Sequence, residues 1–178
     1  MNHRDNIIIT SIYKSPVGDI ILGSAGDTLC LSDWAMGKRR ESNNKRVCRY
    51  LGAKCRDGNS DIVLAAANQL DEYFGGCRKE FDIPLTFTGT EFQNLVWSKL
   101  QSIPYSEVVS YADVASGIGN PKAVRAAASA IASNPLSIFV PCHRVVGSDG
   151  RLTGYDGGLI AKEALLKLES NVSEKLGF

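Results

Sequence analysis

A cysteine and a histidine stand next to each other at Cys142 and His143, directly after Pro141 and the apolar residues 136–140. A cysteine thiol becomes a strong nucleophile only as the thiolate, and a nearby imidazole can lower its pKa or accept its proton. Neighbours in a sequence point in different directions on a strand or helix, so the pair needs a turn or a bridging water to communicate. Taken alone, the pair favours a plainer interpretation, a buried cysteine beside a surface histidine.

Two short helices are predicted before the Cys-His pair. Ser110 can cap the first helix, and the glycines within residues 117–119 end it. Asn120 and Pro121 can supply the cap and the first position of a second helix, which runs to Ala132. Two short helices joined by a glycine-containing turn are typical of a helix-turn-helix, although any helical hairpin has a similar pattern.

The second of these helices consists mainly of alanine. Small side chains favour a helix and also allow it to approach another backbone closely. The helical spacing turns three residues towards the core and four outwards: Val124, Ala128 and Ile131 inwards, and Lys122, Arg125, Ser129 and Ala132 outwards. Together with Arg144 and Arg151, the outer charges could make a few phosphate contacts, although solvated surface charges would look the same.

The amino-terminal third indicates a meander of short strands separated by turns, at residues 7–13, 20–24 and 29–34. Residues 38–60 are polar, and we expect a long connection there with at most a short helix. Residues 61–74 have the apolar spacing of an amphipathic helix, with Asp61 as its cap.

These elements divide the chain into two predicted domains. The extended residues 81–90 form the expected linker, and residues 91–101 open the second half with another amphipathic helix. We therefore expect an α/β amino-terminal domain, residues 1–85, in which an antiparallel sheet carries a helix. The second domain, residues 86–178, should be mostly α-helical and contain the helix-turn-helix.

The composition is that of an ordinary globular protein, with 178 residues, 44% of them hydrophobic, and a net charge of +1. No apolar run is long enough to span a bilayer, and the amino terminus lacks a secretory signal, so we expect a cytoplasmic protein without a membrane partner. The five cysteines are an odd number without a CxxC pair, which argues against a disulfide framework and a zinc site. We expect no metal and no cofactor.

Residues 92–169 closely resemble the catalytic domain of methylated-DNA–protein-cysteine methyltransferases, the O6-alkylguanine-DNA alkyltransferases. These DNA repair proteins take an alkyl group from guanine O6 and keep it on their own cysteine. The resemblance depends on several motifs: IPY followed by SYADVA, the helix start GNPKAVRA, the Asn-Pro at 134–135, PCHRVV, the glycine-flanked Tyr155 and the ending KEALLKLE. Ser106 and Asp156 depart from the family pattern, which often has glycine at the first position and a small, neutral or basic residue at the second.

The resemblance implies direct repair of DNA after the damaged base has been flipped out of the duplex. The alkyl group of O6-alkylguanine would move to Cys142, and whether O4-alkylthymine is also a substrate is left open. An alkyl-cysteine is a thioether without the leaving group of a thioester, so each molecule should react once. The implied partner is double-stranded DNA carrying the lesion, bound through the minor groove by a monomer in the cytoplasm, or in the nucleus of a eukaryote. The family also implies a ribonuclease-H-like fold for the first domain.

The same resemblance assigns the catalytic roles. Glu169 is expected to hydrogen-bond to His143 and orient its ring, so that the other ring nitrogen accepts the Cys142 proton through water. Tyr111 would donate a proton to N3 of the flipped base as charge builds on the purine. Arg125 would take the place of the flipped nucleotide, because a planar guanidinium can stack on bases.

The remaining implied contacts belong to the DNA-binding helix and to the base pocket. The helix would contact DNA through Lys122, Ser129, Ala126 and Ala127. The pocket would be formed by a glycine-rich loop and by backbone groups that read the base edge, with contributions from Val145, Val146, Tyr155, Asp156 and Gly157. Asn134 is expected to brace the helix-turn-helix against the active strand through an Asx-type turn.

Two other classes of function fit parts of the pattern. A hydrolase could use Cys142, His143 and Glu169 for acyl transfer, but it would turn over repeatedly. A DNA-binding regulator or lesion sensor would need Arg125 and the thin helix, but it would not need Cys142. The presence of the reactive side chains together with the helix favours repair over both alternatives.

Overall fold

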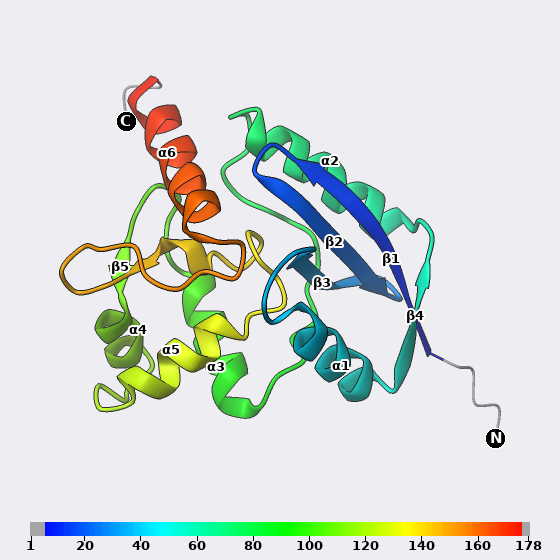
Figure 1. Ribbon diagram of the computed structural model, residues 1–178, viewed down its shortest axis with the longest axis horizontal. Coiled ribbons are helices and arrows are strands. Elements are labelled where there is room, and N and C mark those ends of the chain that lie inside the picture. Colours follow the sequence, from blue (N-terminus) through cyan, green and yellow to red (C-terminus); the bar gives the residue numbers. More distant parts are fainter. Residues whose placement is uncertain (1–5, 176–178) are drawn as a thin grey trace.

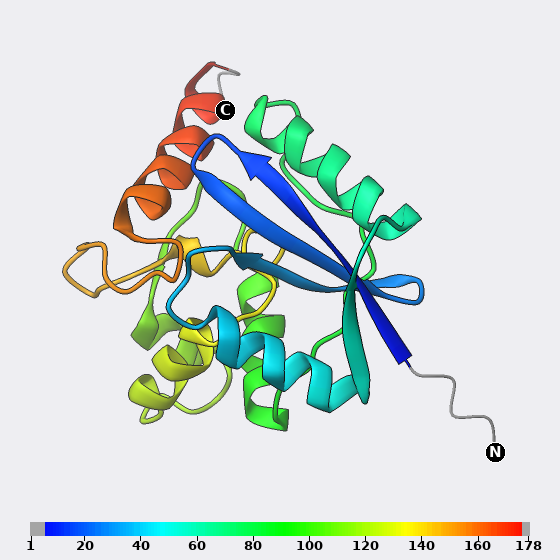
Figure 2. The ribbon, with the colours of Figure 1, turned by 45° about the vertical axis from the view of Figure 1, so that its right-hand side comes forward.

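The computed structural model describes residues 6–175, and their first third forms a four-stranded sheet (Figures 1 and 2). The ends of the two predicted domains, residues 1–5 and 176–178, lie outside the described residues. The spatial order of the strands is β3-β2-β1-β4, with the bounds β1 (Asn6–Ser15), β2 (Gly18–Ala25), β3 (Thr28–Trp34) and β4 (Ala53–Asp57). The first three strands pair antiparallel, which confirms the predicted sheet, and β4 runs parallel to β1 at its edge.

Residues 38–60 differ from the expected long connection with at most a short helix. They contain β4 and a helix of 12 residues, α1 (Arg40–Leu51). The prediction was wrong because α1 buries only Asn43 and Val47, so its sequence shows no apolar stripe and looks like a solvated loop. Arg46 attaches this helix to the second half of the chain, since its guanidinium donates to the Ser133 carbonyl at 2.6 Å.

The next helix, α2 (Asp61–Phe74), has the predicted bounds and covers one face of the sheet (Figure 2). Its cap is Ser60 instead of the predicted Asp61, because Ser60 Oγ accepts a hydrogen bond from the Val63 amide at 3.1 Å. The helix buries Tyr73 near its carboxyl end, on the side that faces the second half of the molecule.

The second half is mostly helical, as predicted. Its elements are α3 (Glu91–Gln101), β5 (Val109–Ser110), α4 (Tyr111–Gly117), α5 (Val124–Ala132), the 3-10 turn η1 (Cys142–Arg144), β6 (Val145–Val146) and α6 (Leu159–Lys175). The predicted pair of short helices is α4 and α5, and both pack against α3. Helix α5 begins at Val124, one turn later than predicted, because Asn120 and Pro121 belong to a turn that the Ala123 amide closes on the Asn120 carbonyl at 3.0 Å.

The segment that leads to Cys142 is held by the edge of the sheet. Ser32 of β3 donates from its amide to the Pro135 carbonyl at 2.8 Å and accepts from the Ser137 amide at 2.7 Å. Its hydroxyl also donates to the Ser137 carbonyl at 2.9 Å. The two halves of the chain share one hydrophobic core cluster, which includes Leu22 of β2 and Leu165 of α6. The sheet therefore positions the site residues of the second half.

Candidate active site

Cys142 lies at the start of η1, almost fully buried, with Asn134 beside it. Asn134 Nδ2 donates to Cys142 Sγ at 3.2 Å and to the Val140 carbonyl at 3.0 Å, and Asn134 Oδ1 accepts from the Leu136 amide at 2.9 Å. Burial raises the pKa of the Cys142 thiol, and the hydrogen bond from Asn134 lowers it. Asn134 thus fixes both ends of the loop before Cys142 and directs a donor at the sulfur.

Glu169 is the centre of a buried hydrogen-bond network behind η1. Its Oε1 accepts hydrogen bonds from Tyr73 Oη at 2.8 Å and from Arg144 Nη2 at 2.9 Å, and it lies 2.7 Å from His143 Nε2. Its Oε2 accepts from Arg144 Nε at 3.0 Å and from the Ser106 amide at 3.2 Å. Tyr73 comes from α2, so both halves of the chain position this carboxylate.

The contacts of Glu169 determine which nitrogen of His143 carries a proton. Burial raises the pKa of Glu169, but the hydrogen bonds from His143 and Arg144 and the positive charge of Arg144 outweigh it and lower the pKa to about 2. An ionised carboxylate only accepts hydrogen bonds, so His143 Nε2 must be the donor. Burial lowers the pKa of His143 more than Glu169 raises it, because Arg144 already balances the carboxylate charge. The imidazole is therefore neutral, with its lone pair on Nδ1.

His143 Nδ1 is buried, and no protein atom in residues 6–175 forms a hydrogen bond with it. Buried polar atoms normally have a partner, either in the protein or in an ordered water. An acceptor of this kind, one residue from a nucleophilic thiol, suits a proton relay through a water molecule.

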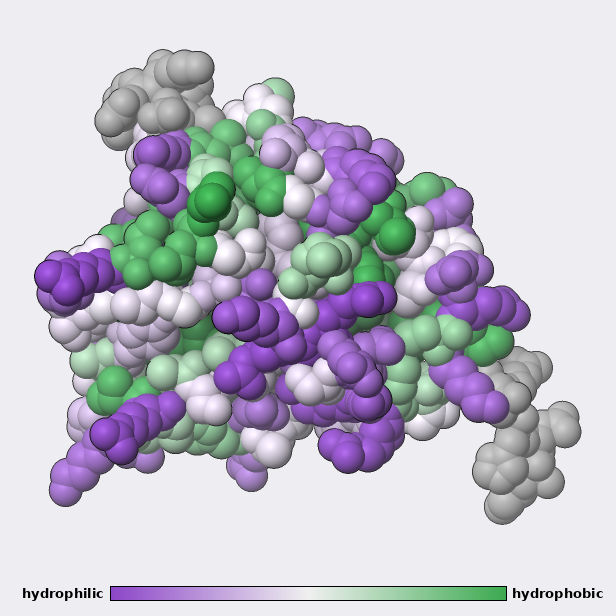
Figure 3. Space-filling model, in the orientation of Figure 1, coloured by the Kyte–Doolittle hydropathy of each residue, from purple (hydrophilic) through white to green (hydrophobic). Residues whose placement is uncertain are grey.

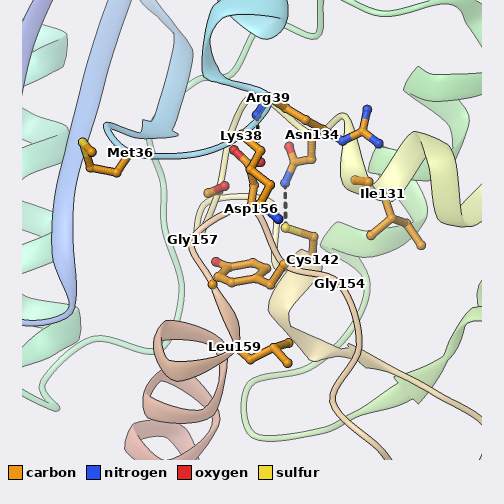
Figure 4. Close-up of a pocket in the computed structure, with 14 residues that line it drawn as sticks. Met36, Lys38, Arg39, Ile131, Asn134, Cys142, Gly154, Asp156, Gly157 and Leu159 are labelled. Carbon is orange, nitrogen blue, oxygen red and sulfur yellow. Dashed lines mark hydrogen bonds between the residues drawn. The ribbon is translucent and has the colours of Figure 1, made fainter.

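A cavity of about 600 Å³ opens over Cys142 (Figure 4). Three of the predicted pocket residues line it, Tyr155, Asp156 and Gly157, and so does Asn134. A side chain at Gly157 would collide with the Trp34 ring, so the loop can lie this close to the sheet only because the residue is glycine.

Val145 and Val146 are not among the residues that line the cavity, so their predicted contact with the base stays a prediction. They form β6, which pairs in parallel with Val109 and Ser110 of β5, and both valines are buried. The family resemblance had implied that backbone groups of these two residues read the edge of the base.

The sequence interpretation missed one wall of the cavity, the connection between β3 and α1. Met36, Lys38 and Arg39 line the cavity from this side (Figure 4). The Arg39 amide donates to Asp156 Oδ1 at 3.0 Å, and a side chain at Gly37 would collide with the Asp156 carboxylate. Figure 3 shows hydrophilic residues over this connection and the start of α1. Residues 38–40 are all basic, a composition typical of a solvated loop, and only the unusual Asp156 could have indicated their role.

Tyr111 and Lys162 meet at the backbone of Thr153, at the edge of the pocket loop. Tyr111 Oη donates to the Thr153 carbonyl at 3.3 Å and does not line the cavity. Lys162, which sequence reasoning did not assign, is fully buried and donates from Nζ to the same carbonyl at 2.8 Å. Burial lowers the pKa of Lys162, and its positive charge lowers the pKa of Cys142. A buried ammonium group here would stabilise a thiolate.

The outer face of α5 exposes Arg125, Ala126 and Ser129, and Lys122 in the preceding turn is exposed as well. Ala127, however, is fully buried and cannot contact DNA, so this part of the prediction was wrong. It lies on the face of α5 that packs against α3, three residues before Ala130, whose carbonyl accepts a hydrogen bond from Trp97 Nε1 at 2.8 Å.

Ser106 departs from the family pattern, and the structure shows what this position requires. Its φ of 66° lies in the left-handed region, which favours glycine over other residues. The same backbone conformation directs the Ser106 amide at Glu169 Oε2. A glycine would adopt this backbone conformation without strain. Ser106 makes the hydrogen bond to Glu169 from a strained backbone.

Two family models match the chain, and between them they span nearly all of it. Residues 91–171 match the model described as the DNA binding domain of 6-O-methylguanine DNA methyltransferase, and residues 8–87 match its ribonuclease-like domain. The chain belongs to this family. The predicted resemblance to the methylated-DNA–protein-cysteine methyltransferases is thus confirmed.

Relatives in this methyltransferase family match the chain over most of its length. One from Methanosarcina acetivorans, named methylated-DNA–protein-cysteine methyltransferase, is 43% identical over 162 residues, which cover 90% of this chain and 97% of the relative. The constitutive protein of that name from Bacillus subtilis is 39% identical over 167 residues, 91% of this chain and 94% of the relative. The structure of Mycobacterium tuberculosis OGT in complex with DNA superposes with a TM-score of 0.78 at 37% identity, covering 93% of this chain and 94% of OGT.

Across residues 6–175, none of the helices has the length and apolar character needed to cross a membrane. Within the same part of the chain, His, Cys, Asp and Glu side chains form no group of three that could bind a metal ion.

Proposed function

We propose that this protein repairs DNA by accepting the alkyl group of O6-alkylguanine on Cys142, once per molecule. The observation that carries the proposal is the position of Cys142 at a cavity of about 600 Å³, with a neutral His143 held behind it by Glu169. A cavity of this volume is large enough for a small ligand such as a single base. Relatives that are 39% and 43% identical are named for this methyltransferase activity.

The proposed reaction is a substitution in one step. A water passes the Cys142 proton to His143 Nδ1, and the thiolate attacks the alkyl carbon from the side opposite to O6. The new S–C bond forms as the C–O bond breaks, and the electron pair of that bond stays on the purine. Tyr111 supplies a proton to N3 of the departing base, for which its hydroxyl must turn from the Thr153 carbonyl towards the base. Asn134 and Lys162 stabilise the negative sulfur before the attack.

The DNA is proposed to lie across α5, which enters the minor groove. Guanine O6 is out of reach inside a duplex, so the damaged base must rotate into the cavity. Arg125 fills the gap that the base leaves, while Lys122, Ala126 and Ser129 allow the backbone to come close. The minor groove discriminates base pairs poorly, which suits a repair protein that must act in any sequence. A monomer in the cytoplasm, or in a eukaryotic nucleus, is sufficient for this task.

The two predicted domains, residues 1–85 and 86–178, would then have different tasks. The second carries the nucleophile, the base and the DNA-binding helix. The first supplies the cavity wall at Arg39 and the hydroxyl of Tyr73 that binds Glu169. Both are needed for a complete site.

The decisive experiment follows the alkyl group. The full chain is mixed with a duplex that contains one O6-methylguanine, digested, and analysed by mass spectrometry. We expect the peptide with Cys142 to gain one methylene per protein molecule, and no gain with an unmethylated duplex. Cys142→Ser should abolish the transfer, whereas Cys77→Ser, which changes an exposed thiol, should not.

Each alternative function gives a different result in the same assay. Removal of more lesions than there are protein molecules would indicate a hydrolase with turnover. Tight binding of the lesion with an unmodified Cys142 would indicate a sensor. A methyl group on a different cysteine would refute the assignment of the nucleophile.

A further inference from the structure

Two cysteines with no part in the proposed reaction lie side by side where α1 meets β4. Cys48 Sγ, in the last turn of α1, is 3.4 Å from Cys55 Sγ in the middle of β4. Gly52, with a left-handed φ of 56°, makes the sharp turn that returns the chain from the helix to the strand. Cys55 is exposed and Cys48 is half-buried, so solvent reaches the pair.

A third side chain holds the two thiols in place. Asn44 Oδ1, one turn before Cys48 on α1, lies 3.3 Å from Cys55 Sγ and 4.0 Å from Cys48 Sγ. Both S–H groups can therefore share this acceptor while the sulfurs stay in contact. One thiol comes from the last turn of a helix and the other from the edge strand of the sheet. Regular secondary structure therefore fixes the distance between them better than a loop would.

The other three cysteines have different surroundings. Cys30, in β3, is buried and donates to the Gly23 carbonyl at 3.4 Å, and it lies near enough to Cys48 and Cys55 for them to add to the effect of burial in raising its pKa. Cys142 is buried in the active site next to Asn134. Cys77 is exposed, and its sulfur contacts the Gly75 carbonyl at 3.7 Å instead of a second thiol. Within residues 6–175, Cys48 and Cys55 are the pair whose sulfurs touch.

We propose that Cys48 and Cys55 form a reversible disulfide when the protein meets a peroxide, so that this corner is a redox modification site. The first sulfur attacks one peroxide oxygen and breaks the O–O bond, which gives a sulfenic acid and one water. The second thiol attacks the sulfenic sulfur and displaces its oxygen as another water. Two thiols are thus oxidised by two electrons, and one hydrogen peroxide is reduced to two waters.

The geometry allows this bond with a small movement. The two sulfurs now lie 3.4 Å apart. A disulfide bond is about 2.05 Å long, so the sulfurs must move closer by roughly 1.4 Å. Burial and the neighbouring Cys48 raise the pKa of Cys55 to about 11. The Cys55 thiol is therefore mostly protonated at neutral pH, and what favours the disulfide is the second sulfur beside it, which can capture a sulfenic acid as soon as it forms.

Oxidation would fasten α1 to the sheet without touching the nucleophile. α1 reaches the second half of the molecule through Arg46, so a tie at its carboxyl end stabilises this connection. Cys142 is buried and its sulfur is bound by Asn134, so peroxide should reach it later than the exposed pair. The oxidised protein should keep its ability to accept an alkyl group.

The test treats the full, reduced chain with increasing hydrogen peroxide. We expect a loss of two hydrogens from the intact mass, a digest in which one peptide links Cys48 to Cys55, and full reversal by dithiothreitol. The oxidised protein should melt at a temperature higher by about 5 °C, because the closed loop restricts the unfolded chain. It should still accept one methyl group from a methylated duplex.

The variants separate this proposal from general oxidation. Cys48→Ser and Cys55→Ser should each abolish the linked peptide and the rise in melting temperature, whereas Cys77→Ser should preserve both. The proposal is overturned if oxidation joins two protein molecules through these cysteines. It is equally overturned if Cys77 or Cys142 is oxidised at peroxide concentrations that leave Cys48 and Cys55 reduced.

Discussion

Arg144 decides how His143 can act. A histidine that faces a buried carboxylate alone would be expected to gain a proton, because the negative charge favours the imidazolium. Here Arg144 binds both oxygens of Glu169, so the carboxylate is ionised and already compensated. The ring can then remain neutral and keep a lone pair for the Cys142 proton. Arg144 thus helps to keep the imidazole neutral, although it does not line the cavity itself.

These charge states predict that acid destabilises the protein in two steps. The pKa of His143 lies below its ordinary 6.5, so the unfolded chain binds this proton first and stability falls as the pH drops below about 6.5. The pKa of Glu169 falls from 4.5 to about 2, so its contribution is present above pH 4.5 and is lost as the pH falls towards 2. The Glu169 step should amount to roughly 3 kcal/mol.

Urea unfolding measured from pH 7 down to pH 2 checks this dependence. The control variant Glu163→Gln removes an exposed carboxylate of the same helix and should leave the profile unchanged. Equal unfolding free energies at pH 7 and pH 4 would contradict the assigned charge states.

The hydroxyl of Tyr73 should contribute measurably to the site. Tyr73→Phe removes one hydrogen bond to the buried, ionised Glu169. We expect the unfolding free energy to fall by about 1.5 to 3 kcal/mol, the range for hydrogen bonds to charged groups. We also expect slower alkyl transfer, because the carboxylate that orients His143 loses a donor.

Tyr13 provides the matched control for this prediction. Its hydroxyl donates to Asp71 at 2.7 Å in an exposed setting, so Tyr13→Phe should change stability by less than about 0.5 kcal/mol. Similar effects for the two variants would show that the Tyr73 bond has no special role.

At the scale of elements, α5 shows how far the sequence alone could lead. Its alanines and its place after a glycine turn predicted a thin helix with Arg125 outside, and the structure has Arg125 exposed. The orientation of individual alanines could not be predicted, because alanine is small and apolar on either face.

Two leucine substitutions on α5 should therefore have opposite effects. Ala127→Leu places a large side chain against α3 and should destabilise the fold by about 1 to 3 kcal/mol through overpacking. Ala126→Leu lies on the exposed face, so it should fold normally but bind duplex DNA more weakly, because it prevents close approach. Thermal unfolding and a DNA-binding titration on both variants check this pair. Normal DNA affinity for Ala126→Leu would argue against contact through this face.

The strands and helices with strong periodic patterns were predictable, and two kinds of feature were not. The bounds of α2 and α3 follow from apolar spacing and from the glycines and prolines at their ends. α1 was missed because it is stabilised by contacts with distant residues, such as the bond from Arg46 to Ser133, and not by an apolar stripe of its own. The cavity wall at Lys38 was missed for the same reason, since it depends on tertiary packing.

At the scale of the whole molecule, the cavity is closed by segments that are far apart in the sequence. The connection between β3 and α1 supplies one wall, and the loop of residues 154–158 supplies the other. The hydrogen bond from the Arg39 amide to Asp156 joins the two walls. The volume available to the alkyl group therefore depends on a contact between the two halves of the chain.

Asp156→Ser should change the preference for large alkyl groups. Losing the bond to the Arg39 amide frees the loop, so we expect the ratio of the benzyl rate to the methyl rate to rise by about threefold or more. Single-turnover rates on duplexes that carry each adduct measure this ratio. Asp149→Ser is the control, because it removes the same charge from an exposed turn outside the cavity. An unchanged ratio in Asp156→Ser would remove Asp156 from the specificity argument.

The common hydrophobic interior of the two halves also bears on cooperativity. Two separate family models match the two halves, and the halves would unfold independently if each had its own hydrophobic core. However, Leu22 and Tyr73 of the first half belong to the same cluster as Trp97 and Leu165 of the second. We therefore expect differential scanning calorimetry to show one heat-absorption peak, with equal calorimetric and van't Hoff enthalpies. Two resolved peaks would contradict this. A chain that melts as a unit cannot unfold its helical half and keep its sheet, so a substitution that destabilises either half lowers the stability of both.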